Sequence, residues 1–263
     1  NGDAKVTEVW NCTTSEGTEV YHPYYNLGNS EIKDLKVSED GQYYQTLSLW
    51  NTSGTLYSKA NKCGINKISN GVELCWGISS YGTHTYTVQY TITKFVSELT
   101  DSQMIYWTLI PYDFSTSIGN VYIKIHTDFE IEDTIDVWGY GNYGGTAYVY
   151  DGYIEMQSDG RLSTNEYMTI LVKFPSNTFN TTNTLKHDFD YYYEMAEEGA
   201  NKYVEKSGID SIEAFILIIN VFFPFLILLI ILIKNGIKSK SAKLHFGREG
   251  KHISRDVPYY RDI

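Results

Sequence analysis

The sequence lacks the compact motifs that identify common enzyme classes. It has no G-x-S-x-G, no H-E-x-x-H, no P-loop and no dinucleotide-binding glycine pattern. The histidines of the N-terminal part do not stand in ligand spacing with one another; they are His22, His84, His126 and His187. We therefore expect a protein that is not an enzyme, has no catalytic residues and uses no cofactor. A hydrolase whose site has an unfamiliar form stays open as an alternative.

Cysteine is scarce, and Cys12, Cys63 and Cys75 do not have the spacing of a metal site. Cys63 and Cys75 flank a predicted turn, so a disulfide between them stays open if the compartment is oxidising. A two-residue loop at Asn70–Gly71 would place Cys63 opposite Ile78 instead, which argues against this disulfide. Cys12 lacks a partner in either case.

Positive charge is also scarce before Ala214, where thirteen Lys/Arg stand against twenty-nine Asp/Glu and Arg161 is the only arginine. Such an acidic surface argues against nucleic acid as a partner and against docking on anionic lipid. A short acidic stretch is the weak candidate for Ca²⁺; it contains Asp128, Glu130, Glu132, Asp133 and Asp136. Its spacing matches no known calcium loop, so we favour a solvated acidic edge.

Strand patterns dominate the first 187 residues. In Thr85–Thr93 the residues Tyr86, Val88, Tyr90 and Ile92 fall on one face, an alternation typical of a half-buried strand. Asn120–His126 and Tyr167–Phe174 repeat this pattern. Weaker patterns predict strands at Val6–Trp10, Glu19–Tyr25, Ile32–Val37, Gly71–Gly77, Met104–Ile110, Ile135–Tyr140 and Thr146–Tyr150.

Turn signals separate these strands at Asp40–Gly41, Asn70–Gly71, Asp151–Gly152 and Asp159–Gly160. No sustained helical period occurs before Asp188. We therefore predict a mainly β protein whose residues 1–187 form an antiparallel β-sandwich outside the cytoplasm.

The character of the sequence changes near residue 188. Residues 188–213 are predicted to form a juxtamembrane helix and linker, because Asp188–Lys206 carries acidic residues early and lysines late. The twenty apolar residues 214–233 would span roughly 30 Å as a helix, the thickness of a bilayer core. We predict one transmembrane α-helix there, followed by a basic cytoplasmic tail at 234–263.

Lysines cluster after the predicted span rather than before it. The membrane-flanking residues are Lys234, Lys238, Lys240 and Lys243. By the positive-inside rule, the C-terminal side is cytoplasmic and the N-terminal domain lies outside. An outer domain ahead of a span needs an export signal, so we expect a signal peptide before Asn1.

The aromatic and glycine-rich segment Trp138–Gly145 is the candidate binding site. Its residues Trp138, Tyr140 and Tyr143 would stack on a sugar or a peptide if the glycines bring their rings to the surface. The alternative is a strand end whose rings pack inward.

Several stretches, in order, resemble a bacterial family of predicted membrane proteins known as domain of unknown function 2207. They are Ala4–Trp10, Tyr86–Ile92, Tyr106–Trp107, Trp138–Gly141, Ala196–Ala200 and Asp256–Ile263. The resemblance implies an export signal, an exported β domain, a membrane helix and a cytoplasmic continuation. It also implies a longer protein in which further membrane helices follow Ile263. The family has no established activity, so it assigns no functional residue.

We therefore expect a cell-envelope protein of the bacterial plasma membrane whose outer β-sandwich binds a ligand or partner. The partners would be the lipid bilayer and either a cell-envelope glycan or another membrane protein. The alternative is a structural subunit that assembles a membrane protein complex.

Overall fold

The computed structural model describes residues 2–112 and 114–200, which belong to one compact unit, Asn1–Ala200. The described elements are β1 (Ala4–Thr14), β2 (Glu19–Tyr25), β3 (Ile32–Glu39), β4 (Gln42–Tyr43), β5 (Gln45–Leu47), α1 (Leu56–Lys59), β6 (Lys62–Ile68), β7 (Gly71–Gly77), β8 (Gly82–Ile92), β9 (Val96–Glu98), β10 (Gln103–Ile110), β11 (Tyr122–Ile125), β12 (Asp136–Tyr140), β13 (Thr146–Tyr150), β14 (Tyr153–Gln157) and β15 (Met168–Phe174). Residues 189–200 form a further helix at the C-terminal limit of the described chain.

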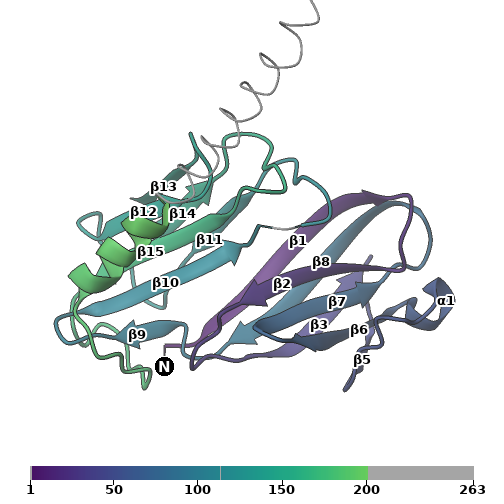
Figure 1. The fold of residues 1–263 in the computed structure, drawn as a ribbon, viewed down its shortest axis with the longest axis horizontal. Coiled ribbons are helices and arrows are strands. Elements are labelled where there is room, and N and C mark those ends of the chain that lie inside the picture. Colours follow the sequence, from purple (N-terminus) through teal and green to yellow (C-terminus); the bar gives the residue numbers. More distant parts are fainter. Residues whose placement is uncertain (1, 113, 201–263) are drawn as a thin grey trace, which may run out of the picture. The chain divides into compact units, whose positions relative to one another are not determined.

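The strands form four sheets rather than the two of a sandwich (Figure 1). Their orders are β1-β8-β3-β4, β2-β7-β6-β5, β12-β15-β10-β9 and β11-β14-β13. Neighbouring strands are antiparallel except β5 and β6, which are parallel. The prediction of an antiparallel β-sandwich is therefore wrong, although the expectation of a mainly β protein is correct.

The prediction failed because the number of sheets depends on which distant strands pair, such as β1 with β8 and β12 with β15. β1 and β2 follow one another in the chain but lie in separate sheets, and so do β12 and β13. Alternation in a sequence identifies the buried face of a strand, but it does not identify the strand's neighbours.

No helix within residues 2–112 and 114–200 has both the length and the apolar character needed to cross a membrane. The predicted transmembrane helix at 214–233 lies outside the described residues, as does the tail with Lys234, Lys238, Lys240 and Lys243.

The strongest strand prediction is confirmed. β8 is central in its sheet, and Tyr86, Val88 and Ile92 are fully buried there. The Asp40–Gly41 and Asp151–Gly152 turns are also confirmed as two-residue hairpin loops. Both residues of each loop have positive φ, the backbone conformation that a type I′ hairpin requires.

The prediction for Asn70–Gly71 is wrong. β6 and β7 pair with Ile68 opposite Gly71 and Cys63 opposite Trp76, so the loop consists of residues 69–70. Gly71 is needed for close packing instead, because a Cβ atom there would lie 1.9 Å from the carbonyl oxygen of Tyr24 in β2. Cys63 and Cys75 are both buried and free, so they form no disulfide.

The other end of β7 is constrained in the same way. A Cβ atom on Gly77 would lie 1.9 Å from the carbonyl oxygen of Lys59. The seven-residue strand therefore begins and ends where another part of the backbone lies directly against it.

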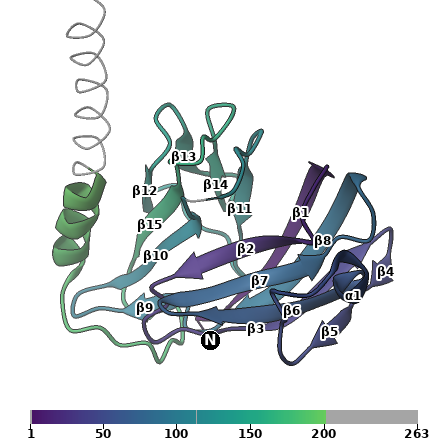
Figure 2. The same cartoon turned by 45° about the vertical axis from the view of Figure 1, so that its right-hand side comes forward.

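All four sheets contribute to one large hydrophobic core. Members from the four sheets include Val88, Trp76, Ile170 and Ile154. A second, smaller core lies on the other face of β15, where Leu171 contacts the layer formed by helix 189–200. β15 is consequently buried on both faces (Figure 2).

The helix 189–200 begins with a side-chain cap. Asp188 Oδ1 accepts a hydrogen bond from the backbone N–H of Tyr191 at 3.1 Å, as an N-cap residue does. Asp101 holds the same end, because its Oδ1 accepts from the N–H of Phe189 at 2.9 Å. The start of the helix is thus fixed to the sheet that it covers.

Candidate functional site

The residues predicted to bind a ligand lie in two different environments. The Trp138 ring lies 5.4 Å from the rings of both Phe189 and Tyr193 on the helix. The Tyr140 hydroxyl donates a hydrogen bond to Glu197 Oε1 at 2.9 Å, and burial together with this carboxylate raises the pKa of Tyr140. Trp138 and Tyr140 therefore hold the helix, and they do not form a platform with Tyr143.

Tyr143 is 99% exposed on a turn whose backbone is well fixed. Gly141 and Gly144 have positive φ. The Asn142 side chain donates to Glu166 Oε1 at 2.7 Å and accepts from the N–H of Asp159 at 2.8 Å. The glycines thus make a tight turn between two sheets, as their conformational freedom allows.

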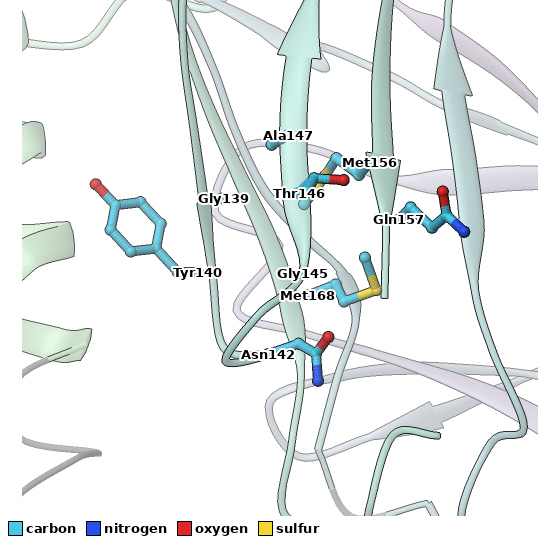
Figure 3. Close-up of a pocket in the computed structure, with 9 residues that line it drawn as sticks. All are labelled: Gly139, Tyr140, Asn142, Gly145, Thr146, Ala147, Met156, Gln157 and Met168. Atoms are coloured by element: carbon cyan, nitrogen blue, oxygen red, sulfur yellow. The ribbon is translucent and has the colours of Figure 1, made fainter. Parts of the chain in front are cut away.

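A small pocket lies at this turn, between β12 and β13 (Figure 3). It has a cavity volume of about 50 Å³ and is lined by Gly139, Tyr140, Asn142, Gly145, Thr146, Ala147, Met156, Gln157 and Met168. The Tyr140 ring points away from the other lining side chains (Figure 3). The predicted segment therefore lines a pocket mainly through glycine backbone and Asn142, not through its aromatic rings.

The acidic stretch forms no metal site in the part of the chain that the structure describes. Asp128, Glu130, Glu132, Asp133 and Asp136 are all exposed. No cluster of three or more histidine, cysteine or acidic side chains suited to a metal ion occurs among residues 2–112 and 114–200.

An exposed aromatic surface lies on the sheet β11-β14-β13. We call it the tyrosine face, and it consists of Tyr122, Tyr148, Tyr150 and Tyr153. Tyr122, Tyr148 and Tyr150 are 56%, 41% and 64% exposed, and Tyr153 stands opposite Tyr150 in the ladder. The alternate residues of the same strands, such as Val149, face the core. The sheet is thus apolar inside and aromatic outside.

Glu155 lies at the centre of the tyrosine face and accepts hydrogen bonds from two of its hydroxyl groups. It lies opposite Tyr148 on one side and opposite Lys124 on the other. The Tyr122 hydroxyl donates to Glu155 Oε1 at 2.7 Å, and the Tyr148 hydroxyl donates to Oε2 at 3.4 Å. The hydrogen bond to this carboxylate raises the pKa of Tyr122.

Lys124 fixes the orientation of Tyr153, the fourth ring of the tyrosine face. Its Nζ lies 3.5 Å from the centroid of the Tyr153 ring, a cation–π contact, and 3.9 Å from Glu155 Oε1. The rings are therefore oriented before any ligand arrives, which lowers the entropic cost of binding.

The tyrosine face was not predicted, although part of its signal is visible in the sequence. Thr146–Tyr150 was correctly predicted as a strand, and its Tyr148 and Tyr150 alternate with Ala147 and Val149. With 24 tyrosines in the chain, this short alternation did not stand out. The pairing of β13 with β14, which sets Glu155 among the rings, is a long-range feature of the fold.

A second carboxylate, Glu8, lies among aromatic side chains where strands of different sheets meet, and its side chain is 17% exposed. Glu8 accepts hydrogen bonds from Tyr90 and, at 2.7 Å, from Trp10 Nε1. Its Oε1 lies 3.0 Å from Nδ1 of His22, whose Nε2 lies 3.1 Å from the carbonyl oxygen of Leu109. We call Glu8, Trp10, His22 and Tyr90 the buried polar cluster.

The buried polar cluster has a structural role. Burial by itself raises the pKa of Glu8, but the charge of His22 and the hydrogen bonds from His22, Tyr90 and Trp10 outweigh it and lower the pKa. His22 is fully buried, and the contacts join β1, β2, β8 and β10. Because its polar atoms have partners within the protein, the cluster holds strands of different sheets together.

Comparison with known proteins identifies the family. Residues 1–174 match the family described as "Predicted membrane protein (DUF2207) N-terminal domain". Neither the curated proteins nor the solved structures gave a match. Because the match covers well over half of the chain, the protein belongs to this family of membrane proteins of unknown function, as the sequence motifs suggested.

Proposed function

We propose that this member of the membrane-protein family is a recognition protein that binds a neutral glycan of the cell envelope on its tyrosine face. The observation that carries the proposal is the set of four tyrosine rings on one sheet around Glu155, three of which are exposed. A tyrosine combines an apolar ring with a polar hydroxyl, so it suits a ligand that offers both C–H faces and hydroxyl groups.

The shape of the face favours an extended ligand. Sites for whole small molecules are usually concave and enclose most of the ligand. The tyrosine face follows three adjacent strands, and the pocket beside it has a volume of only about 50 Å³. A polymer that lies across the sheet fits this geometry better than a single small molecule.

The charge of the face favours a neutral ligand. The outward side chains of the three strands include one carboxylate, Glu155, and one ammonium group, Lys124, which lie 3.9 Å apart. They offset each other, so the face gains little from an ionic partner. The acidic sequence around it also repels polyanions at long range.

We further propose that the domain lies outside the plasma membrane and that the tail is cytoplasmic, from the lysines after residue 233. A domain in this position meets envelope glycans directly. The alternative function is an assembly subunit, because exposed tyrosines are also enriched in protein–protein interfaces.

The test is glycan binding by the full chain reconstituted in lipid nanodiscs, with immobilised envelope polysaccharides and their oligomers. The variant Tyr148→Ala/Tyr150→Ala removes two rings from the face. Tyr57→Ala is the matched control, because Tyr57 is 92% exposed on α1, away from this sheet. We expect the double variant to lose at least tenfold in affinity, about 1.4 kcal/mol, and the control to bind normally. Equal binding by both variants contradicts the proposal.

A further inference from the structure

We propose that two copies of this chain associate through the free edge of β1, with the two β1 strands antiparallel across a two-fold axis at Val9. The inference concerns a different sheet from the tyrosine face and does not depend on glycan binding. β1 stands at the end of the order β1-β8-β3-β4, so only one of its two edges is paired. The other edge is a template for a strand of a second chain.

β1 is the longest edge strand in the part of the chain that the structure describes. It has eleven residues and no proline, whereas β4, β5, β9, β11, β12 and β13 have two to five. The other long edge strand, β2, is buried around its Pro23, a residue that cannot donate to a ladder. Natural edges are normally short or protected in such ways, so the long edge of β1 indicates a partner.

The backbone groups on this edge belong to the odd-numbered residues of β1. Thr93, directly after β8, donates its N–H to the carbonyl oxygen of Glu31 at 2.9 Å. Odd residues of β8 therefore face β3 and even residues face β1. Each even residue of β8 stands opposite an even residue of β1, as Val88 does opposite Glu8. The residues whose N–H and C=O groups face the free edge are thus Lys5, Thr7, Val9, Asn11 and Thr13.

The free edge of β1 is open to solvent. Among the described residues, no backbone hydrogen bond joins these five residues to another segment. Buried backbone groups are nearly always paired, so unpaired groups in such a row lie in water. The side chains of the five residues are exposed as well, and Val9 is 62% exposed.

Full overlap of two antiparallel β1 strands fixes one register. Ala4 then stands opposite Thr14 of the second copy, and the middle residue, Val9, stands opposite its own copy. Odd residues meet odd residues, so their N–H and C=O groups are aligned to exchange hydrogen bonds, and a shift by one residue would remove this match. Val9 is the only apolar side chain on the outward face of β1, and the two-fold axis gives it an apolar neighbour.

The charge of this surface permits the approach of a second copy. Residues before 214 carry twenty-nine Asp/Glu against thirteen Lys/Arg, so most surfaces of two copies repel each other. The outward side chains of β1 and β8 include no carboxylate and one charge, that of Lys5; the others are Thr7, Val9, Asn11, Thr13, Thr83, Thr85, Thr87, Gln89 and Thr91. Lys5 stands opposite Thr13 of the second copy, which keeps the two lysines about 27 Å apart at ~3.4 Å per residue.

The first test is disulfide crosslinking of the full chain in the membranes of the cells that express it, with Cys12→Ser as the background. Val9→Cys places two thiols at the axis, where the Cα atoms of such a pair lie ~5.5 Å apart, within reach of a disulfide. We expect it to crosslink roughly tenfold more than Tyr57→Cys, the control for random collision, because Tyr57 is 92% exposed and remote from β1.

A pair of variants tests the register. Lys5→Cys should not crosslink with itself, because its copy lies at the far end of the strand. It should crosslink with a coexpressed Thr13→Cys chain, which the register places directly opposite.

Two further variants test whether the backbone edge makes the contact. Val9→Pro removes an N–H that faces the free edge rather than β8, so the fold is kept while the second copy loses its partner. Val9→Lys sets two like charges at the axis, whereas Asn11→Lys, the matched control, sets them apart. In light scattering of the detergent-solubilised full chain, we expect both Val9 variants to weaken dimerisation roughly tenfold or more, and Asn11→Lys to change it little. Tryptophan fluorescence verifies that each variant is folded.

Four outcomes overturn the proposal. They are a monomer in both membranes and detergent, equal crosslinking by Val9→Cys and Tyr57→Cys, a dimer whose affinity is unchanged in folded Val9→Pro, and crosslinking of Val9→Cys to a different protein. The last outcome would give the edge another occupant. None of the four affects the glycan proposal, which has its own binding assay.

Discussion

Glu8 and Glu155 are each surrounded by aromatic side chains, and their side chains keep similar small exposed fractions, 17% and 13%, but Glu8 joins strands of different sheets while Glu155 lies on the outer face of one sheet. Glu8 accepts from Tyr90 and Trp10 and faces His22. Glu155 accepts from Tyr122 and faces Lys124. Similar groups are therefore used twice. Glu8 connects strands of different sheets, whereas Glu155 orders the rings on the outer face of one sheet, where we propose that a ligand binds.

The largest difference between the two regions should appear when each carboxylate is removed. Glu8→Ala leaves the Trp10 indole N–H, the Tyr90 hydroxyl and His22 without their acceptor, so we expect a loss of about 3–5 kcal/mol of unfolding free energy. Glu155→Ala leaves partners that water can satisfy, and its unfolding midpoint should stay close to that of the unaltered protein. Chemical denaturation followed by tryptophan fluorescence measures both. Equal losses of unfolding free energy in Glu8→Ala and Glu155→Ala would show that the two carboxylates do not differ in their structural role.

The covered aromatic layer should respond almost as strongly. Trp138 packs against Phe189 and Tyr193, so Trp138→Ala should cost about 3 kcal/mol of unfolding free energy. Tyr150→Ala, on the open face, should cost far less because its ring is already 64% exposed. The same denaturation assay measures the unfolding free energy of both variants. A mild Trp138→Ala variant would mean that the helix is held by other contacts.

Acid should affect Glu8 in a predictable direction. The folded protein lowers the pKa of Glu8, so its stabilising contribution is present above the unfolded pKa of about 4.3. That contribution is lost as the pH falls through the lower, folded pKa. Between pH 5 and pH 3 the unaltered protein should therefore lose more unfolding free energy than Glu8→Gln does. Parallel acid slopes in the two proteins would contradict this assignment.

The smallest effect should come from a single hydroxyl. Tyr140→Phe removes the hydrogen bond to Glu197 but keeps the ring that packs against the helix, so we expect a loss of about 1 kcal/mol. Tyr122→Phe on the open face should leave the unfolding midpoint unchanged. A thermal scan of both variants provides the measurement, and a larger loss in Tyr122→Phe would place a structural role on the tyrosine face.

Local sequence signals predicted local structure well. The alternation in Thr85–Thr93 identified the buried face of β8, and Asp40–Gly41 identified a hairpin because two successive residues must have positive φ. β6, in contrast, escaped prediction. Its Gly64 lies against the Trp50 ring, and its sequence KCGINKI shows no regular alternation.

The sheet arrangement and the site depend on contacts between distant residues. Nothing near Trp138 in the sequence indicates that a helix fifty residues later covers it. Likewise, Glu155 becomes the centre of the tyrosine face only because β14 pairs with both β11 and β13. Rings that stay exposed and rings that pack therefore look alike in the sequence, and only the tertiary structure distinguishes them.

The glycines at the two ends of β7 have a further use, in the search for distant relatives. At Gly71 and Gly77 even a methyl group would collide with a backbone carbonyl, and a backbone cannot be replaced by mutation. Random mutagenesis of the chain should therefore recover no functional substitution at either position, while the surface of the same strand varies. A spacing of Gly-x₅-Gly around a buried strand is then a marker that survives when most of the sequence has diverged.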